Sequence, residues 1–219
     1  MESLRGKIIM KTLAILGASG HGKVAAEIAL ALGWQQIDFY DVNWLNEKNL
    51  CKWKVIGDEK SFFLKAKEYD ATFVAIGNNS ARKQKLEALF KTSNNVVNLI
   101  SPSAIISTYV EIGLGNLVAN GACINIDSKL GNGVIINTAA TIDHDCCISD
   151  YVHICPGVHI AGNVSIGKNS WIGIGSTIIQ NLTIGSNSIV GAGSVAIRNL
   201  PSDITAVGVP TKIIKGKTN

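Results

Sequence analysis

The segment Ile142-Asp143-His144-Asp145-Cys146 places an imidazole between two carboxylates. A histidine hydrogen-bonded to a carboxylate is a good general base, because the carboxylate stabilises the protonated ring and raises its pKa. Such a base takes the proton from an amine or hydroxyl that attacks a reactive carbonyl. Either Asp145 or Asp143 could be the partner of His144. Neighbouring residues of a strand point to opposite sides, so direct contact with either requires that the segment lie at a corner. The alternative for His144 is a solvent-exposed polar corner.

A glycine run forms a second candidate site. Gly17-Ala18-Ser19-Gly20-His21-Gly22 follows an apolar strand and precedes a helix, and such glycines let phosphates approach the helix amides. Their order differs from the G-x-G-x-x-G dinucleotide fingerprint, which argues against a nicotinamide oxidoreductase. Asp41, about twenty residues on at a strand end, could hold a ribose or a base. The alternative is a tight strand-to-helix turn that binds nothing.

The first half of the chain supplies the elements around this run. Strands and helices alternate here, which predicts a parallel sheet with crossover helices. We therefore expect a small Rossmann-like α/β domain at residues 11–99. The predicted strands cover 12–16, 36–40, 70–76 and 95–99, and the predicted helices cover 23–32 and 81–90.

From residue 100 the pattern changes to a period of six. Every sixth residue is a branched aliphatic, which is the mark of stacked short strands and corners in a β-helix. A period of six does not stay on one face of an α-helix. We expect this β-helix at residues 100–195, without insertions, and a C-terminal tail at 196–219. The aliphatic positions are Ile100, Ile106, Ile112, Val118, Ile124, Leu130, Ile136, Ile142, Ile148, Ile154, Ile160, Ile166, Ile172, Ile178, Ile184 and Val190.

The period also places the histidines. His144 lies two residues past the interior Ile142, hence at a corner, and one coil of eighteen residues later stands Gly162, which leaves room for a reacting group. His153 precedes an interior isoleucine and should lie on the outer face of its coil. His159 has the same phase on a different face, and we assign it no role.

Composition excludes several classes of protein. A net charge of +4 with 6% aromatics, and no concentration of positive charge, argues against a nucleic-acid-binding protein. We interpret the densest basic run, Arg82-Lys83-Gln84-Lys85, as a solvated helix face. Five cysteines lack the spacing of a disulfide framework, and we expect no metal site. Lys11 interrupts the N-terminal apolar run, and no stretch is long enough to span a membrane. We therefore expect a cytoplasmic protein without membrane insertion.

These hexads, the Gly-Ala-Ser-Gly-His-Gly run and the His144 segment together resemble the hexapeptide-repeat sugar acetyltransferases. The similarity is strongest to bacterial UDP-4-amino-sugar N-acetyltransferases, including those that make UDP-di-N-acetylbacillosamine, and it extends to sialic acid O-acetyltransferases. It covers residues from about 11 to 215. The resemblance implies a left-handed β-helix, a homotrimer, and acetyl-CoA bound between neighbouring chains. It implies N-acetylation of a UDP-amino-sugar, with O-acetylation of a sialic acid as the alternative.

The resemblance also assigns roles to individual residues. His144 matches the catalytic base, and Asp145 matches a position where relatives commonly carry glutamate, which favours Asp145 over Asp143 as its partner. Positions that match acetyl-CoA contacts are His153, Gly162, Ile174 and Ala192, while a surface histidine is the alternative for His153. Positions that match contacts to the UDP-sugar are Ser19, Gly20, His21, Asp41 and Gly77.

Overall fold

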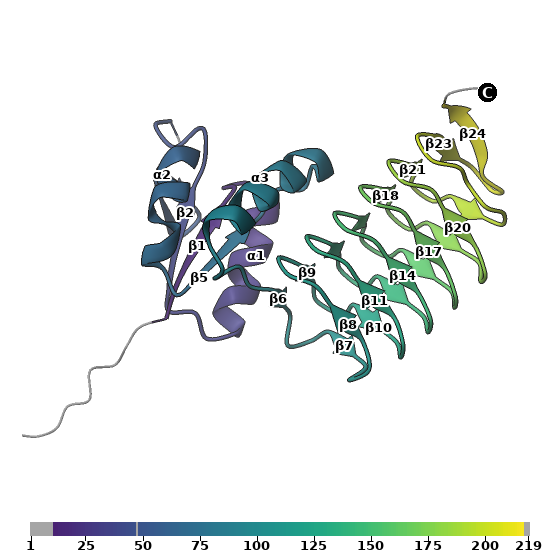
Figure 1. Ribbon diagram of the computed structural model, residues 1–219, viewed down its shortest axis with the longest axis horizontal. Helices are drawn as coiled ribbons and strands as arrows, with labels where there is room; N and C mark the ends of the chain where they lie inside the picture. Colours follow the sequence, from purple (N-terminus) through teal and green to yellow (C-terminus); the bar gives the residue numbers. More distant parts are fainter. Residues whose placement is uncertain (1–10, 47, 217–219) are drawn as a thin grey trace, which may run out of the picture.

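The computed structural model describes residues 11–46 and 48–216 (Figure 1). The N-terminal apolar run up to residue 10 and residues 217–219 of the expected tail lie outside this part. The described chain forms an α/β domain beside one end of a long β-helix, and its C-terminus lies at the opposite end of the β-helix.

The N-terminal domain is built on a five-stranded sheet with strand order β3-β4-β2-β1-β5. Strands β1, β2, β4 and β5 run parallel, and β3 pairs antiparallel with β4. Since β1 lies between β2 and β5, the carboxyl ends of these three parallel strands meet at one edge, where parallel sheets bind ligands. The elements are β1 (Thr12–Leu16), α1 (Gly20–Ala31), β2 (Gln36–Tyr40), β3 (Asn49–Leu50), β4 (Trp53–Gly57), α2 (Glu59–Lys65), the 3-10 turn η1 (Ala66–Glu68), β5 (Ala71–Val74) and α3 (Asn79–Thr92).

The Rossmann-like α/β architecture expected for this half is confirmed, but two details differ. The hairpin β3–β4 and helix α2 were not expected. The strand predicted at 95–99 is wrong: only Val96 makes an isolated bridge to Thr72, and Leu99–Ile100 pairs with Leu117–Val118 as the first strand of the β-helix. Because Leu99 is buried between the two parts, its apolar character suited either sheet.

The β-helix has three parallel sheets, and each successive strand joins the next sheet in turn. We number them in the order in which the chain visits them. The first sheet contains β6 (Leu99–Ile100), β9 (Leu117–Val118), β12 (Ile135–Ile136), β15 (His153–Ile154), β18 (Trp171–Ile172), β21 (Ile189–Val190), β23 (Thr205–Val207) and β24 (Lys212–Lys215). The second contains β7 (Ile105–Ile106), β10 (Cys123–Ile124), β13 (Thr141–Ile142), β16 (His159–Ile160), β19 (Thr177–Ile178) and β22 (Val195–Ala196). The third contains β8 (Glu111–Ile112), β11 (Lys129–Leu130), β14 (Cys147–Ile148), β17 (Ser165–Ile166) and β20 (Thr183–Ile184).

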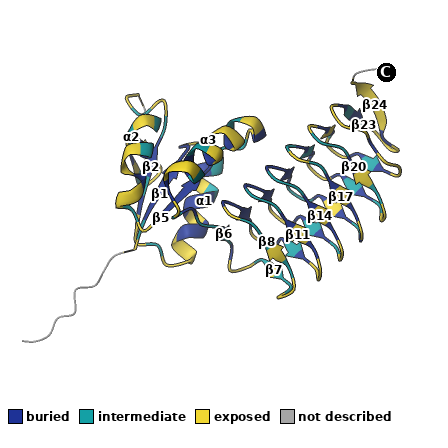
Figure 2. Cartoon of the chain, in the orientation of Figure 1, coloured by how far each residue is buried: buried dark blue, intermediate teal, exposed yellow. Residues whose placement is uncertain are grey.

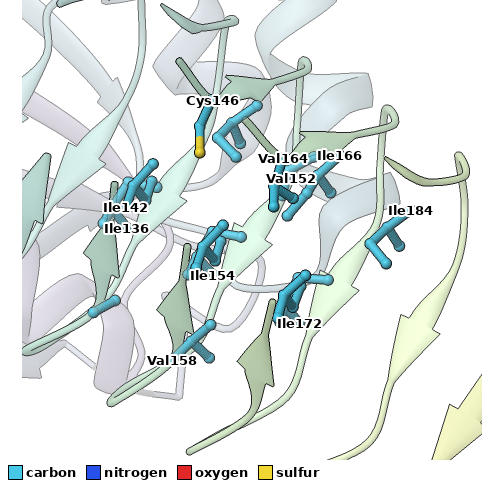
Figure 3. Close-up of a cluster of buried hydrophobic side chains, with 14 of the residues drawn as sticks. Ile136, Ile142, Cys146, Val152, Ile154, Val158, Val164, Ile166, Ile172 and Ile184 are labelled. Atoms are coloured by element: carbon cyan, nitrogen blue, oxygen red, sulfur yellow. The ribbon is translucent and has the colours of Figure 1, made fainter. Parts of the chain in front are cut away.

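Aliphatic columns fill the interior of this prism. The second residue of almost every strand points inward, and Ile136, Ile154 and Ile172 stack in one column with partners eighteen residues apart (Figure 3). Small buried residues such as Cys146 and Val158 complete each layer. Figure 2 shows the buried interior along the coils and the exposed residues at the corners. The aliphatic period read from the sequence is thus the core of the fold.

From the corner after Ile112 to the one after Val190, each corner turns through a residue with positive φ, three positions after the interior aliphatic. Glycine, asparagine and aspartate tolerate this left-handed conformation best. They occupy the position at nearly every corner, including Asp145 (φ 60°), whereas Tyr151 (φ 60°) is a bulky exception. The corner after the first sheet is called the first edge, that after the second sheet the second edge, and that after the third sheet the third edge.

The strands continue past the expected limit of the β-helix at residue 195. Val195–Ala196 lies in the second sheet, and β23 pairs parallel with β21 before β24 closes the end antiparallel to it. Within residues 11–46 and 48–216, no helix is long and apolar enough to cross a membrane.

Candidate active site

His144 and Asp145 form a hydrogen-bonded pair on the second edge. Nδ1 of His144 lies 2.7 Å from Oδ2 of Asp145. The contact is possible because Asp145 takes the left-handed conformation at the corner, which turns its side chain back beside its neighbour. This bond is the largest cause of a raised pKa of His144. Asp143, the alternative partner, instead accepts from Asn125 Nδ2 and from the backbone N–H of His144.

Gly162 lies directly beside the His144 ring. A Cβ atom at Gly162 would come within 2.5 Å of Cε1 and 2.6 Å of Nε2 of His144. Because Gly162 has no side chain, the His144 ring fits beside it and its Nε2 stays accessible. Since the His144 side chain is 55% exposed, a reacting group can approach Nε2 from solvent.

An apolar groove of about 620 Å³ runs along the first edge and the end of the first sheet. Gly173 and Gly191 line it without side chains, beside Ile174 and Ala192. A groove of this shape and polarity suits a narrow flexible chain. The residues that line it are Asn137, His153, Cys155, Pro156, Trp171, Gly173, Ile174, Ile189, Val190, Gly191 and Ala192.

His153 stands where this groove meets the N-terminal domain. Its ring lies outside the coil, as expected, but the neighbouring domain covers it to 5% exposure. Nε2 lies 3.2 Å from Asn137 Nδ2, and the ring centroid lies 4.2 Å from that of Trp171 and 6.4 Å from that of His21. Burial is the main cause that lowers the pKa of His153 to about 3 and that of His21 to about 4, so both rings are neutral at pH 7.

The residues expected to bind a nucleotide gather at the carboxyl edge of the N-terminal sheet. Ser19 is the N-cap of α1 but its side chain makes no capping bond, and Gly20 is the first residue of that helix. Asp41 follows β2 and accepts from the N–H of Ala18 at 2.8 Å. Gly77 follows β5 on the other side of β1. His21 links this edge to His153 and the groove.

The candidate residues thus fall into two groups on one chain. His144 and Gly162 lie on the second edge, whereas the groove with His153, Ile174 and Ala192 lies on the first edge. The second sheet separates these two edges. A single chain therefore does not bring the base and the groove together.

Sequence reasoning missed several residues of these surroundings. Asn137 and Trp171 contact His153. Trp171 lies one coil after His153, and Asn137 lies two residues past Ile135, which is one coil before His153, so the period could have revealed both. The interpretation of Arg82 as part of a solvated helix face is wrong, because its side chain is buried to 1% exposure between the domain and the β-helix.

All five cysteines are free thiols. Cys146 and Cys155 are buried in the β-helix core, whereas Cys51 and Cys147 are exposed. In the described part of the chain, no three His, Cys, Asp or Glu side chains are arranged to hold a metal ion.

Comparison with known proteins places this architecture in a family. Residues 12–89 match the PglD N-terminal domain, and residues 163–197 match six bacterial transferase hexapeptide repeats. A histidine-to-asparagine variant of perosamine N-acetyltransferase from Caulobacter crescentus, crystallised with CoA and GDP-perosamine, superimposes with a TM-score of 0.89 at 36% identity. The match covers 95% of this chain and 98% of that one. The chain belongs to the hexapeptide-repeat sugar N-acetyltransferases.

Two further members of this family are similar to the chain. The acetyltransferase domain of PglB from Neisseria gonorrhoeae, solved with acetyl coenzyme A, has a TM-score of 0.90 at 39% identity, over 93% of this chain and 99% of that one. UDP-N-acetylbacillosamine N-acetyltransferase of Bacillus subtilis is 39% identical over 123 residues, which are 48% of this chain and 50% of that protein. The chain thus aligns with half the length of this curated relative. The β-helix is the left-handed type expected for such acetyltransferases.

Proposed function

We propose that this protein transfers the acetyl group of acetyl-CoA to the amino group of a nucleotide-activated sugar, with His144 as the general base. The acceptor we infer is a UDP-4-amino-4,6-dideoxy sugar. The observation that carries the proposal is the His144–Asp145 pair, held at 2.7 Å on an open corner with Gly162 beside the ring. The family relationship supports acetyl transfer to a sugar amine.

The pair accounts for the proton transfers. Because Nδ1 of His144 is bonded to Asp145, Nε2 is the nitrogen free to accept a proton. The sugar amine attacks the thioester carbonyl carbon as Nε2 takes a proton from the amine nitrogen. The resulting tetrahedral oxyanion collapses, the C–S bond breaks, and the imidazolium returns the proton to the departing thiolate. Asp145 stabilises the imidazolium during these steps.

The apolar groove on the first edge is our site for the pantetheine arm of acetyl-CoA, in contact with His153, Ile174 and Ala192. The phosphate end then lies nearer the C-terminal end of the β-helix. Arg198 occupies the second edge three coils beyond His144, which is a rise of about 14 Å at 4.8 Å per coil. Arg198 and Lys212 line a pocket of about 320 Å³ there, and two cations suit phosphate groups.

A homotrimer completes the site in this proposal. The outward side chains of the second sheet form a column without Lys, Arg, Asp or Glu: Ile105, Cys123, Thr141, His159, Thr177 and Val195. The third sheet instead carries charged groups such as the Glu111–Lys129 ion pair, and the first is partly covered by the N-terminal domain. Interface cores are depleted of charge, so the second sheet suits the three-fold axis. Its two flanking edges then meet the neighbours, which brings His144 of one chain to the groove of the next.

The acceptor nucleotide belongs at the carboxyl edge of the N-terminal sheet. The N–H groups at the start of α1, beside Ser19 and Gly20, are donors for the diphosphate. Asp41, His21 and Gly77 surround this helix end. The link from His21 to His153 places this edge beside the groove, so the sugar amine can extend toward the thioester.

The test is acetyl transfer from acetyl-CoA across a panel of nucleotide amino-sugars, with free and CMP-linked sialic acid included. We expect turnover of UDP-4-amino sugars, and a loss of roughly 10²–10⁴ in kcat for His144→Ala in an intact trimer. Turnover of sialic acid alone would replace N-acetylation with O-acetylation. Near-normal turnover by His144→Ala would remove His144 as the base.

A further inference from the structure

Arg82 is a buried cation at the junction of the two domains. It lies in the first turn of α3, which together with α1 lies on the side of the N-terminal domain that faces the β-helix (Figure 1). Its side chain is 1% exposed. In the described part of the chain, none of its hydrogen-bond partners is a carboxylate. Burying an unpaired charge is costly, so its retention calls for a specific role.

All five guanidinium N–H groups have acceptors. Nη1 donates to the carbonyls of Ile76 and Gly77, at 3.0 and 2.9 Å, in the loop that follows β5. Nε donates to the carbonyl of Gly133 at 2.7 Å, in one coil of the β-helix. Nη2 donates to Asn79 Oδ1 at 2.8 Å and to the carbonyl of Tyr151 at 2.9 Å, in the next coil. One side chain therefore joins a loop of the domain to two coils.

The coil that Arg82 holds leads directly to His153. Tyr151 has φ 60°, an unfavourable conformation for a bulky residue that persists only where its surroundings impose it. The bond to its carbonyl and the packing of its ring against the core of the N-terminal domain are such constraints. His153 follows two residues later. The guanidinium of Arg82 thus bonds to Gly77 on one side and, on the other, to Tyr151, two residues before His153.

Asn79 supports the same junction. While its Oδ1 accepts from Arg82, its Nδ2 donates to the carbonyls of Asn169 and Ser170 at 3.1 and 3.0 Å, one coil beyond Tyr151. The first turn of α3 therefore contacts three successive coils through hydrogen bonds. Since no N–H of Arg82 remains free, the guanidinium cannot bind a substrate directly.

We propose that Arg82 is a positioning residue that fixes Gly77, at the nucleotide-sugar edge, relative to His153, in the acetyl-CoA groove. This inference rests on the proposed function, because it assigns those two residues to two substrates. The sugar amine and the thioester must meet within about 3–3.5 Å, and a displacement of about 1 Å costs on the order of 10²-fold in rate. Arg82 sets this alignment without touching either substrate.

The charge of Arg82 has a second effect on the same junction. After burial, it is the next largest cause that lowers the pKa of both His21 and His153. Burial lowers the pKa of Arg82 itself to about 9, so the guanidinium stays protonated at pH 7. Burial and, after it, the charge of Arg82 together keep His21 and His153 neutral at pH 7.

The experiment compares Arg82→Lys with wild type and with Lys85→Met. The lysine keeps a cation but cannot span the acceptors of the planar fork. In folded, trimeric Arg82→Lys we expect kcat to fall 10- to 100-fold, while the Kd of acetyl-CoA and that of the UDP-amino-sugar, each measured alone, stay within about threefold. Lys85→Met is the control, since Lys85 lies on the same helix but pairs with Glu59 inside the N-terminal domain. Its kcat should stay within about twofold of wild type.

A purely structural role would give a different result. It would lower the melting temperature and leave the kcat of the folded enzyme unchanged, which would overturn the proposal. If Arg82→Lys does not fold, Asn79→Ala replaces it, with an expected 3- to 10-fold loss of kcat on the same reasoning. Hydrogen exchange gives a readout without turnover: amides at 75–81 and 150–155 should exchange faster in Arg82→Lys. Unchanged exchange there would also overturn it. Inactive wild type would instead refute the proposed function.

Discussion

Replacing Gly162 with alanine tests the geometry around His144 without touching the imidazole itself. The new Cβ would lie 2.5 Å from Cε1 of the ring, whereas carbon atoms in contact are about 3.5 Å apart, so the ring must move by about 1 Å. Such a displacement of a catalytic group costs on the order of 10²-fold in rate. We therefore expect kcat to fall 10- to 100-fold.

The same substitution should not harm the fold. Gly162 has no positive φ, and the equivalent hexad position at other corners carries Lys168, Ile174 and Ala192, so a side chain is tolerated by the backbone. A tolerated glycine-to-alanine change stabilises a protein by about 0.4–1 kcal/mol through the unfolded state.

The assay is steady-state acetyl transfer together with thermal unfolding of wild type, Gly162→Ala and Gln180→Ala. Gln180 occupies the same position one coil later, so its variant controls for a change on this edge away from the ring. We expect a slow and stable Gly162→Ala enzyme and a normal Gln180→Ala enzyme. A Gly162→Ala enzyme with kcat within twofold of wild type would refute the assignment of His144.

Three further predictions concern separate parts of the structure. Asp145 raises the pKa of His144, so the neutral, basic form of His144 is lost as pH falls through that raised value. In Asp145→Asn, the acidic limb of the kcat/KM profile should therefore move to lower pH, and its plateau should drop. A pH–rate profile with an unmoved acidic limb would exclude the pairing of His144 with Asp145. Arg198→Ala should raise the KM for acetyl-CoA about tenfold with little change in kcat. With an acetyl donor that lacks the nucleotide, wild type and Arg198→Ala should have the same KM. Equal KM values for acetyl-CoA would remove Arg198 from the phosphate site. Ile154→Ala leaves a cavity at a fully buried core position, so the free energy of unfolding should fall by about 2–5 kcal/mol, measured by chemical denaturation. A loss below about 1 kcal/mol would mean that the coil collapses into the cavity.

The β-helix could be predicted from the sequence because each coil repeats one constraint. Interior positions such as Ile136 and Ile154 recur with the same phase, and no insertion shifts it. The end of the N-terminal domain was harder to predict, since Leu99 is apolar and buried whether it joins one sheet or the other. The local sequence pattern does not decide whether residues 95–99 join the sheet of the N-terminal domain or the first sheet of the β-helix.

The backbone conformation of the corners could be predicted where the residue type favours positive φ. Glycine, asparagine and aspartate recur three residues after the interior aliphatic, and this period places Asp145 in the conformation that brings it to His144. Arg82 could not be predicted in this way. It stands in a basic run on a helix, and only the distant carbonyls of Gly133 and Tyr151 make its burial possible.

The claim that the active site is shared between chains can be measured by subunit mixing. His144→Ala lacks the base, and Ala192→Trp should block the apolar groove, so each variant alone should be inactive. In trimers assembled from an equal mixture, about one quarter of the interfaces pair an intact His144 with an intact groove of the neighbour, and activity should recover to about that fraction of wild type. Persistent inactivity of the mixture, with mixed trimers shown by mass spectrometry, would contradict a site built from the second edge of one chain and the first edge of the next.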